Sequence, residues 1–497
     1  MTNDLAVSRR RALGLIGATA GAGAGLLPAG AVAAPALAGA TWHSTTATVA
    51  WQARAVPAFA PAPANPFDQD AVVRIDAPAQ TIAGFGGAFS EIGWQALSLL
   101  PPAERDRAMA LLFGAEGCGF SLCRTPIGAS DFARQWYSYD EAPGDFALDH
   151  FSVANDRATL IPYIKAAQAV RPDLRLWASP WSPPTWMKHG GHYAQSPAWP
   201  GQPANGIRPD QVGHEGSDSF ILDDRTLDAY ARYFRRYVEA YRAEGIRVDT
   251  VMPQNEFNSA QPYPSCTWTP EGLARFIPHL AREMDQIGVA VFFGTLERDN
   301  PDLFSRVIAD PAAAAAIKGI GVQWAGKGAL PVLRARFPHM DLWASEQECG
   351  VGTNDWHYAR YGWATMKRYF AAGASAWMYW NMVLPTGGLS HWGWPQNSLL
   401  VIDPVMRRLA VTPDYWLMRH VGGAVRPGAR ALPVDSFLGF EDQLAFRNPD
   451  GSLVLVASNA IAQPQRVHYM IGGRCLVLDL PGDSLNTVVI PAAQVPA

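Results

Sequence analysis

Two glutamates each follow a short apolar run that is typical of a β-strand. Glu256 lies in the stretch 248–259, which reads VDTVMPQNEFNS, and Glu346 lies in the stretch 341–350, which reads DLWASEQECG. Pro253 cannot donate a hydrogen bond to a sheet, so regular strand pairing should stop just before Glu256. An acid at the exit of a parallel barrel strand lies at the end where active sites gather. The spacing therefore predicts a pair of carboxyl groups at the ends of two strands.

The middle of the chain alternates β-prone runs with helical patterns, and this alternation would position the two acids. Strands that alternate with helices imply a parallel sheet, and eight of them imply a (β/α)8 barrel, the α/β fold known as the TIM barrel. The segments predicted to be its strands are 82–89, 119–124, 174–179, 248–252, 289–294, 320–324, 342–345 and 375–380.

Two of the intervening segments carry clear helix signals. In 269–287, Thr269 can cap the first turn, Pro270 suits the first helical position, and apolar residues recur at helical spacing. In 227–244, a second apolar stripe precedes Gly245, which is suited to ending a helix. Both segments are predicted to be helices between barrel strands.

After about residue 403 the pattern changes to short alternating β-prone runs with turn signals. The turn sequence 448–451 separates two such runs and the pair 472–473 separates two more, so two hairpins are predicted. The β-prone segment 47–75 is expected to join this module, which would make an all-β sandwich from both ends of the chain. The predicted domains are an export signal at 1–38, an N-terminal sandwich segment at 39–78, the barrel at 79–403 and the C-terminal sandwich at 404–497.

The first residues are typical of a twin-arginine export signal. The arginines 9–11 precede an apolar stretch at 12–27, and the small residues 31–33 fit a cleavage site. A membrane anchor is the weaker interpretation, because the stretch is rich in Gly and Ala and falls short of the ~20 strongly apolar residues that a span needs. We therefore expect export to the periplasm or the extracellular space, with no membrane span in the mature protein.

Composition argues against several classes of function. The formal net charge of −4 argues against a nucleic-acid partner. The five cysteines are scattered, with no CxxC or Cys/His cluster, so no structural zinc site, other metal or cofactor is predicted. Cys118 and Cys123 could pair in an oxidising compartment, and a buried free thiol at each position is the alternative.

The chain is rich in tryptophan, with 18 residues, and several of them follow the predicted strands. Aromatic faces suit the C–H faces of sugars, which favours a carbohydrate ligand, whereas filling the core of a large barrel is the alternative for any single tryptophan. Trp181, Trp324 and Trp380 cluster beside polar and acidic groups. They are therefore the candidates for contact with a sugar.

Five separated motifs occur between about residue 76 and the C-terminus: GFGGAF at 84–89, RTPIGASDF at 124–132, ASPWSPPTW at 178–186, QNE at 254–256 and ASE at 344–346. In sequence and in order they resemble glycoside hydrolase family 30, the family of lysosomal glucosylceramidase and of bacterial and fungal endo-β-1,6-glucanases. The resemblance implies a (β/α)8 barrel with an attached β-sandwich and a retaining mechanism on β-glycosides. By position, Glu256 resembles the family's acid/base and Glu346 its nucleophile.

A retaining glycosidase needs one protonated carboxyl to assist the leaving group and one ionised carboxyl to attack the anomeric carbon, ~5–5.5 Å apart. Glu346 would form a glycosyl ester, and Glu256, by then deprotonated, would activate the water that hydrolyses it. The two acids need different pKa values, which favours a cation near Glu346. Arg124, at the end of the second strand, is the candidate, and a buried structural ion pair is its alternative role.

The resemblance also implies which residues hold the sugar. Asn255 would hydrogen-bond the 2-hydroxyl. Asp131 and Trp181 resemble residues of the subsite for the non-reducing sugar, and Trp380 and Asn381 close the eighth strand beside it. Ordinary packing at the rim of the barrel is the alternative for these residues, above all for Asn381.

Two departures from the family pattern bear on the substrate. Phe257 replaces the proline that commonly follows Asn-Glu, and Gln323 and Trp324 stand where the glucosylceramidases carry His-Trp or His-Tyr. The first departure is expected to change only loop shape. The second touches the predicted substrate-binding face and weakens the case for glucosylceramide itself. The long loop 188–218 is also expected to affect substrate choice.

Three other acids lie near the predicted strand ends. Glu348 is a rival nucleophile two residues after Glu346, but the family places its nucleophile directly after the small residue. Glu91 and Glu297 are interpreted as structural or supporting groups.

The sequence therefore predicts an exported retaining β-glycosidase that acts on a β-linked glucan or glucoside, either glucosylceramidase-like or β-1,6-glucanase-like. One alternative is a β-xylosidase- or β-fucosidase-type exo enzyme of the same family, and another is a catalytically silent secreted carbohydrate-binding protein. A metal-dependent hydrolase on the same barrel would need His and Asp ligands that converge at the strand ends, which carry Glu, Trp, Ser and Gln instead.

Overall fold

The computed structural model describes residues 36–436 and 440–497 of the chain. Most of the predicted export signal, residues 1–35, lies outside the described residues. Within the described ranges, no helix is long and apolar enough to cross a membrane.

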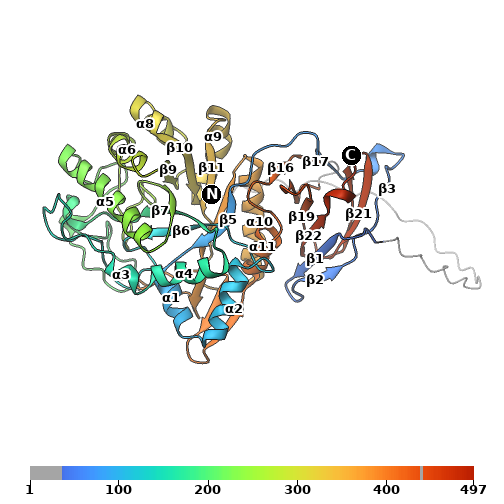
Figure 1. Cartoon of the computed structure of the whole chain (residues 1–497), viewed down its shortest axis with the longest axis horizontal. Coiled ribbons are helices and arrows are strands. Elements are labelled where there is room, and N and C mark those ends of the chain that lie inside the picture. Colours follow the sequence, from blue (N-terminus) through green and yellow to red (C-terminus); the bar gives the residue numbers. More distant parts are fainter. Residues whose placement is uncertain (1–35, 437–439) are drawn as a thin grey trace, which may run out of the picture. The chain divides into compact units, whose positions relative to one another are not determined.

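Eight parallel strands close into a barrel, as the alternating sequence pattern predicts (Figure 1). The strands follow one another around the barrel in chain order, and the last, β12, closes the ring against the first, β5. Every predicted barrel segment overlaps an observed strand. The strands are β5 (Gly84–Ala88), β6 (Leu122–Ile127), β7 (Arg175–Pro180), β8 (Val248–Val251), β9 (Ala290–Leu296), β10 (Ile317–Gln323), β11 (Asp341–Glu346) and β12 (Ala376–Asn381).

Helices connect the barrel strands, and both helices predicted in detail are present as α5 (Asp224–Ala243) and α6 (Pro270–Asp285). The side chains of Asp223 and Thr269 cap them by accepting hydrogen bonds from backbone N–H groups of the first turn. Such caps satisfy donors that the start of a helix leaves unpaired.

The remaining α-helices are α1 (Glu91–Ser98), α2 (Pro102–Phe113), α3 (Ala154–Arg157), α4 (Leu160–Val170), α7 (Asp302–Val307), α8 (Pro311–Ala316), α9 (Leu330–Arg336), α10 (Trp356–Ala371) and α11 (Pro413–Gly422). Short 3-10 helices are η1 (Pro66–Asp68), η2 (Thr185–Met187), η3 (Pro209–Gln211), η4 (Trp324–Gly328) and η5 (Ala492–Gln494). A small sheet follows the barrel and consists of β13 (Val383–Pro385), β14 (Leu400–Asp403) and β15 (Arg408–Val411).

The two ends of the described chain build a β-sandwich, as predicted. One sheet has the order β16-β18-β19-β22-β1-β2 and the other has the order β17-β4-β20-β21-β3. Strand β1 pairs with β22, and the two ends of the chain, blue and red in Figure 1, therefore meet in one sheet. Apolar side chains from both sheets, including Trp42, Leu455 and Leu476, form one buried cluster.

The sandwich strands are β1 (Thr41–Thr46), β2 (Gln52–Arg54), β3 (Ala60–Pro61), β4 (Ala71–Val73), β16 (Arg430–Leu432), β17 (Val434–Ser436), β18 (Gln443–Arg447), β19 (Leu453–Asn459), β20 (Gln465–Ile471), β21 (Arg474–Leu480) and β22 (Ser484–Ile490). Strands β2, β3 and β4 come from the segment 47–75 that was expected to join this module, and β1 lies just before it.

Helix α11 contacts the sandwich through a buried histidine. The two ring nitrogens of His420 each lie 2.8 Å from a hydroxyl oxygen, that of Thr487 on β22 and that of Thr45 on β1. Burial lowers the pKa of His420 to about 3, so the ring is neutral at ordinary pH. The hydroxyl of Thr487 donates to the carbonyl oxygen of His420, so it accepts from Nδ1 of the neutral ring, and Nε2 accepts from Thr45.

All five cysteines lie in the described part of the chain, and each is buried as a free thiol. Burial raises the pKa of the Cys123 thiol to about 12. The structure therefore favours free thiols over a bond between Cys118 and Cys123. Within the same described ranges, no three His, Cys, Asp or Glu side chains are grouped so that they could hold a metal ion.

Candidate active site

Glu256 and Glu346 meet at the carboxyl ends of the barrel strands. Glu346 is the last residue of β11, and Glu256 lies in the turn after β8. Only 8% and 6% of their surfaces are exposed, and both line a cavity of about 420 Å³. The side-chain nitrogen of Gln323 lies 3.3 Å from Oε1 of Glu256 and 3.3 Å from Oε2 of Glu346. These two oxygens are therefore no farther apart than twice that distance, which fits the ~5–5.5 Å spacing of a retaining pair.

Glu346 is surrounded by hydrogen-bond donors. Nη1 of Arg124 donates to its Oε2 at 2.5 Å, and the indole N–H of Trp324 donates to its Oε1 at 3.0 Å. Burial raises the pKa of Glu346, and Arg124 and Trp324 act in the opposite direction. The cation that the sequence predicted for this carboxyl is therefore in direct contact with it.

Glu256 has few such donors. Gln323 donates to Oε1, and Oε2 is buried with no hydrogen-bond partner among the described residues. Burial raises the pKa of Glu256 well above its usual range, and the nearby acids Glu346, Glu297 and Asp131 add to this. Of the two glutamates, Glu256 is thus the one that is suited to carry a proton.

Arg124 connects several of the predicted residues. Its guanidinium is fully buried, and Nη2 donates to Oγ of Ser179 at 2.8 Å and to Oδ1 of Asn255 at 2.6 Å. The guanidinium carbon also lies 4.7 Å from the ring centre of Trp177 and 4.2 Å from that of Trp181. Arg124 thereby holds Asn255 in place and opposes the rise in the pKa of Glu346.

The turn after β8 has an unusual backbone conformation. Glu256 has a φ of 46°, in the left-handed region that residues with a side chain seldom adopt. Its N–H donates to Oγ1 of Thr295 at 2.8 Å. The side-chain amide of Gln254 donates to the carbonyl oxygens of Trp181 and Asn255 at 2.7 and 2.8 Å. The side chain of Thr295 on β9 and that of Gln254 in the turn itself thus hold the turn in place.

The predicted sugar-binding residues divide into two groups. Those that line the cavity are Asp131, Trp181, Asn255 and Trp324. Trp380 is buried with its ring stacked 5.1 Å from that of Trp181. Asn381 is also buried and donates to Oε1 of Gln396 at 2.8 Å. Gln396, which the sequence did not single out, lines the cavity where Asn381 does not.

Loops supply most of the cavity wall that sequence reasoning missed. These residues are Trp199, Ser259, Gln261, Tyr263, Arg298, Ala325, Lys327, Trp394 and Gln396. Trp199 belongs to the loop 188–218, and its ring lies 5.0 Å from that of Trp394, nearly two hundred positions later. Only their aromatic type could have marked these two residues as candidates.

The rival acid Glu348 has its own partners. Nζ of Lys327 donates to it at 2.5 Å and the hydroxyl of Tyr361 at 2.6 Å. Glu348 also lines the cavity, but Glu346 is the acid that shares Gln323 with Glu256.

The other departure from the family pattern, Phe257, is fully buried away from this cavity, with its ring 5.4 Å from that of Phe293.

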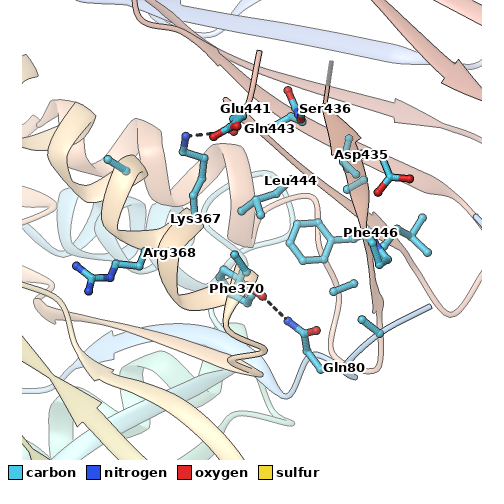
Figure 2. A pocket seen from close by; sticks show the side chains of 18 residues that line it. Gln80, Lys367, Arg368, Phe370, Asp435, Ser436, Glu441, Gln443, Leu444 and Phe446 are labelled. Carbon is cyan, nitrogen blue, oxygen red and sulfur yellow. Dashed lines mark hydrogen bonds between the residues drawn. The ribbon is translucent and has the colours of Figure 1, made fainter. Parts of the chain in front are cut away.

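A larger cavity, of about 750 Å³, lies between α10 and the sandwich strands β16, β17 and β18, and Figure 2 shows the side chains around it. Lys367 pairs there with Asp442 and donates to the carbonyl oxygen of Glu441 at 3.3 Å. Gln80 donates to the carbonyl oxygen of Phe370 at 2.9 Å. These polar contacts are explained by the packing of the helix against the sandwich, so the barrel cavity is the better candidate for catalysis.

Three comparisons with known proteins identify the family and the fold. A family model described as the glycosyl hydrolase family 30 TIM-barrel domain matches residues 82–423. The lysosomal acid glucosylceramidase of Mus musculus is 27% identical over 417 residues, covering 76% of this chain and 75% of that protein. The endo-1,6-beta-D-glucanase BGN16.3 of Trichoderma harzianum is 24% identical over 434 residues, covering 83% and 84%. The crystal structure of SrfJ from Salmonella typhimurium has a TM-score of 0.79 at 24% identity, over 90% of this chain and 99% of that one.

Proposed function

Since this chain belongs to glycosyl hydrolase family 30 and is a glycoside hydrolase, we propose that it cleaves β-glucosidic bonds with retention, with Glu346 as nucleophile and Glu256 as acid/base. One observation carries the proposal: Gln323 donates to both carboxyl groups, whereas Arg124 donates to Glu346 alone of the two. The pair is close enough for a double displacement, and its surroundings differ as the two roles require.

In the first step, an ionised oxygen of Glu346 attacks the anomeric carbon, and the bond from that carbon to the leaving oxygen breaks. Glu256 gives its proton to the leaving oxygen, which departs as an alcohol. The product on the enzyme is a glycosyl ester of Glu346. Arg124 and Trp324 stabilise the carboxylate before the attack.

In the second step, Glu256 is a carboxylate and takes a proton from water. The water oxygen attacks the anomeric carbon and displaces Glu346, so the sugar leaves with its original β configuration. The proton gained by Glu256 restores the starting state of the pair.

We propose a β-linked glucan or glucoside as the substrate. The aromatic residues Trp181 and Trp324 line the cavity, and Asp131 and Asn255 in the same wall offer partners for sugar hydroxyl groups. The two relatives are named for glucosylceramide and for β-1,6-glucan, so both kinds of substrate belong in a test. Gln323 stands where the glucosylceramidases carry histidine, which favours the glucan.

We also propose that the protein is exported by a twin-arginine signal at residues 1–38 and acts in the periplasm or outside the cell. The support is the arginine, apolar and small-residue pattern of the sequence. Replacing Arg9 and Arg10 with Lys is expected to retain the protein in the cytoplasm, measured by cell fractionation. Normal export of this variant would refute the twin-arginine route.

The decisive experiment is hydrolysis of phenyl β-glucoside, β-xyloside and β-fucoside and of β-1,6-glucan, with the first anomer released identified by proton NMR. A β-configured first product is expected, with glucose as the best sugar. An α-configured first product would overturn the nucleophile assignment. Absence of turnover on the whole panel would favour a carbohydrate-binding protein, and loss of turnover with a chelator would overturn a mechanism of two carboxyl groups alone.

A further inference from the structure

A third buried carboxyl group lies in the wall of the same cavity. Glu297 directly follows β9, and only 2% of its surface is exposed. The two-step mechanism above does not use this group. Burying an acid is costly unless other groups compensate for the lost contact with water, so the neighbours of Glu297 need an explanation.

Glu297 holds the turn that carries Glu256. Its Oε1 accepts the backbone N–H of Asn258 at 3.2 Å and the hydroxyl of Ser259 at 2.9 Å. Thr295, two residues before Glu297, accepts the N–H of Glu256. The left-handed conformation of Glu256 persists only where its surroundings hold it. Side chains at the end of β9 therefore help to hold the backbone conformation at Glu256.

The second oxygen of Glu297 is free of such contacts. Its Oε2 is buried and has no hydrogen-bond partner among the described residues. Arg298 lies 3.5 Å from Oε1 of Glu297, and the half-exposed Glu215 binds Arg298 through both of its oxygens at 3.0 and 3.1 Å. The other titratable groups near the Glu256–Glu297 pair are Arg124, Asp131, Tyr263, Lys327, Glu346 and Glu348.

Of the two acids, Glu297 has the surroundings that favour ionisation more, because a cation and two donors lie beside it. Burial raises the pKa of Glu297 to about 7, and Arg298, Ser259 and Asn258 act in the opposite direction. Glu256 has no neighbouring cation that donates to it, and Glu297 is one of the acids that raise its pKa. An ionised Glu297 therefore makes loss of the proton from Glu256 less favourable.

We propose that Glu297 is a positioning residue for the acid/base: it holds the turn 256–259 through Oε1, and its negative charge keeps Glu256 protonated until the leaving group takes the proton. Glu297 transfers no proton itself. The inference rests on the roles proposed above for Glu256 and Glu346.

The effect of the negative charge of Glu297 on Glu256 is tested by Glu297→Gln, which removes the charge and keeps an acceptor at Oε1. Without the neighbouring charge the pKa of Glu256 falls, so the alkaline limb of the pH profile of kcat/KM moves to lower pH, by about one unit. The shift is expected with a phenyl β-glycoside, whose leaving group needs a proton. It is not expected with the dinitrophenyl glycoside, whose leaving group needs none. The matched control, Glu215→Gln, removes a charge from the other side of Arg298 and leaves the limb in the wild-type position.

The hold on the turn is tested by Glu297→Asp, which keeps the charge but withdraws the acceptor from Asn258 and Ser259. This variant is expected to keep the wild-type alkaline limb and to lower kcat for the phenyl glycoside by about tenfold, with little change in KM, because one to two hydrogen bonds at the acid/base are lost.

Any one of three results overturns the inference. They are an alkaline limb at the wild-type pH in Glu297→Gln, an equal shift of that limb in Glu215→Gln, and a wild-type kcat in Glu297→Asp. If Glu297→Gln does not fold, Glu297→Asp still tests the hold on the turn, and a wild-type kcat in that variant overturns the inference. Failure of the proposed function is distinguishable from failure of this inference, because it appears in the wild-type protein. That protein would then turn over no β-glycoside or would release an α-configured first product.

Discussion

At the scale of single residues, the barrel site treats its two carboxyl groups differently. Among the described residues, Glu346 receives hydrogen bonds from Arg124, Trp324 and Gln323, whereas the carboxyl group of Glu256 receives one, from Gln323. A cation and several donors favour an ionised carboxylate, and burial without them favours the protonated acid. Two residues of the same type can therefore take opposite roles.

Glu346→Gln is expected to lower kcat on a phenyl β-glucoside on the order of 10⁴-fold or more, because the amide cannot form the glycosyl ester. The thermal unfolding midpoint is expected to stay near that of the wild type. Glu348→Gln, at the rival acid, should lose far less activity. If Glu348→Gln is the inactive variant instead, the nucleophile is Glu348.

Trp324→Phe removes the indole donor to Glu346 and keeps an aromatic ring. The ionised form of Glu346 loses a hydrogen bond, so its pKa rises and the acidic limb of kcat/KM moves to higher pH, by about one unit. The control is Trp186→Phe, which removes an indole donor to the carbonyl oxygen of Asp140 outside the cavity wall. An acidic limb that moves in neither variant would show that Arg124 and Gln323 keep Glu346 ionised without the indole of Trp324.

At the scale of elements, the ends of four neighbouring barrel strands supply the two proposed catalytic glutamates and side chains beside them. Strand β8 leads to Glu256, β9 to Glu297, β10 to Gln323 and β11 to Glu346. Parallel strands place these residues at the same end of the barrel. Side chains at the end of β9 then hold the turn after β8, so the position of the acid/base depends on two strands.

The N-terminal cap of α6 tests whether local signals stabilise the elements between the strands. Oγ1 of Thr269 accepts the N–H of Gly272 at 2.9 Å. Thr269→Ala is expected to lower the free energy of unfolding by about 1 kcal/mol, measured by urea denaturation, and Thr269→Ser is expected to retain it. Thr269→Ala also removes the hydrogen bond from Oγ1 of Thr269 to Asp218 at 2.8 Å, so equal stability of the wild type and the Ala variant would mean that neither the cap nor this bond stabilises the fold.

At the scale of the whole molecule, α11 and the sandwich are connected by a histidine that the fold keeps neutral. The pKa of His420 is about 3 in the folded protein because of burial, against 6.5 for an ordinary histidine. The unfolded chain therefore binds a proton that the folded chain does not bind. The stability that His420 contributes is complete above about pH 6.5 and is lost as the pH falls from there toward 3.

His420→Gln is expected to flatten the fall in the free energy of unfolding between pH 6 and pH 4, since the wild-type histidine contributes up to about 1.4 kcal/mol per pH unit there. Urea denaturation at several pH values measures the slope. The control is His150→Gln, because His150 is exposed and paired with Asp145 on the surface. An unchanged slope in His420→Gln would show that this ring is not kept neutral by the fold.

The outline of the barrel was predictable because strands have local signals. Every predicted barrel segment overlaps a strand, and the largest displacement, at β6, has a local cause: Gly119 has a φ of 60°, so the strand begins later than predicted, at Leu122. Contacts of the site were predicted only in part. Arg124 was expected to neutralise Glu346, whereas nothing in the sequence indicated that the indole of Trp324 would donate to the same carboxyl.

The sequence by itself determined the eight strands, the sandwich built from both chain ends and the two glutamates at strand exits, because β-prone runs, turns and motifs are properties of short stretches of chain. Only the tertiary structure decided that Gln323 reaches both carboxyl groups, that Gln396 lines the cavity where Asn381 does not, and that Glu297 lies beside the turn of Glu256. Each of these contacts joins side chains from different strands or loops. Which of them meet depends on how the barrel closes and how its strands are staggered, which no single stretch of sequence contains.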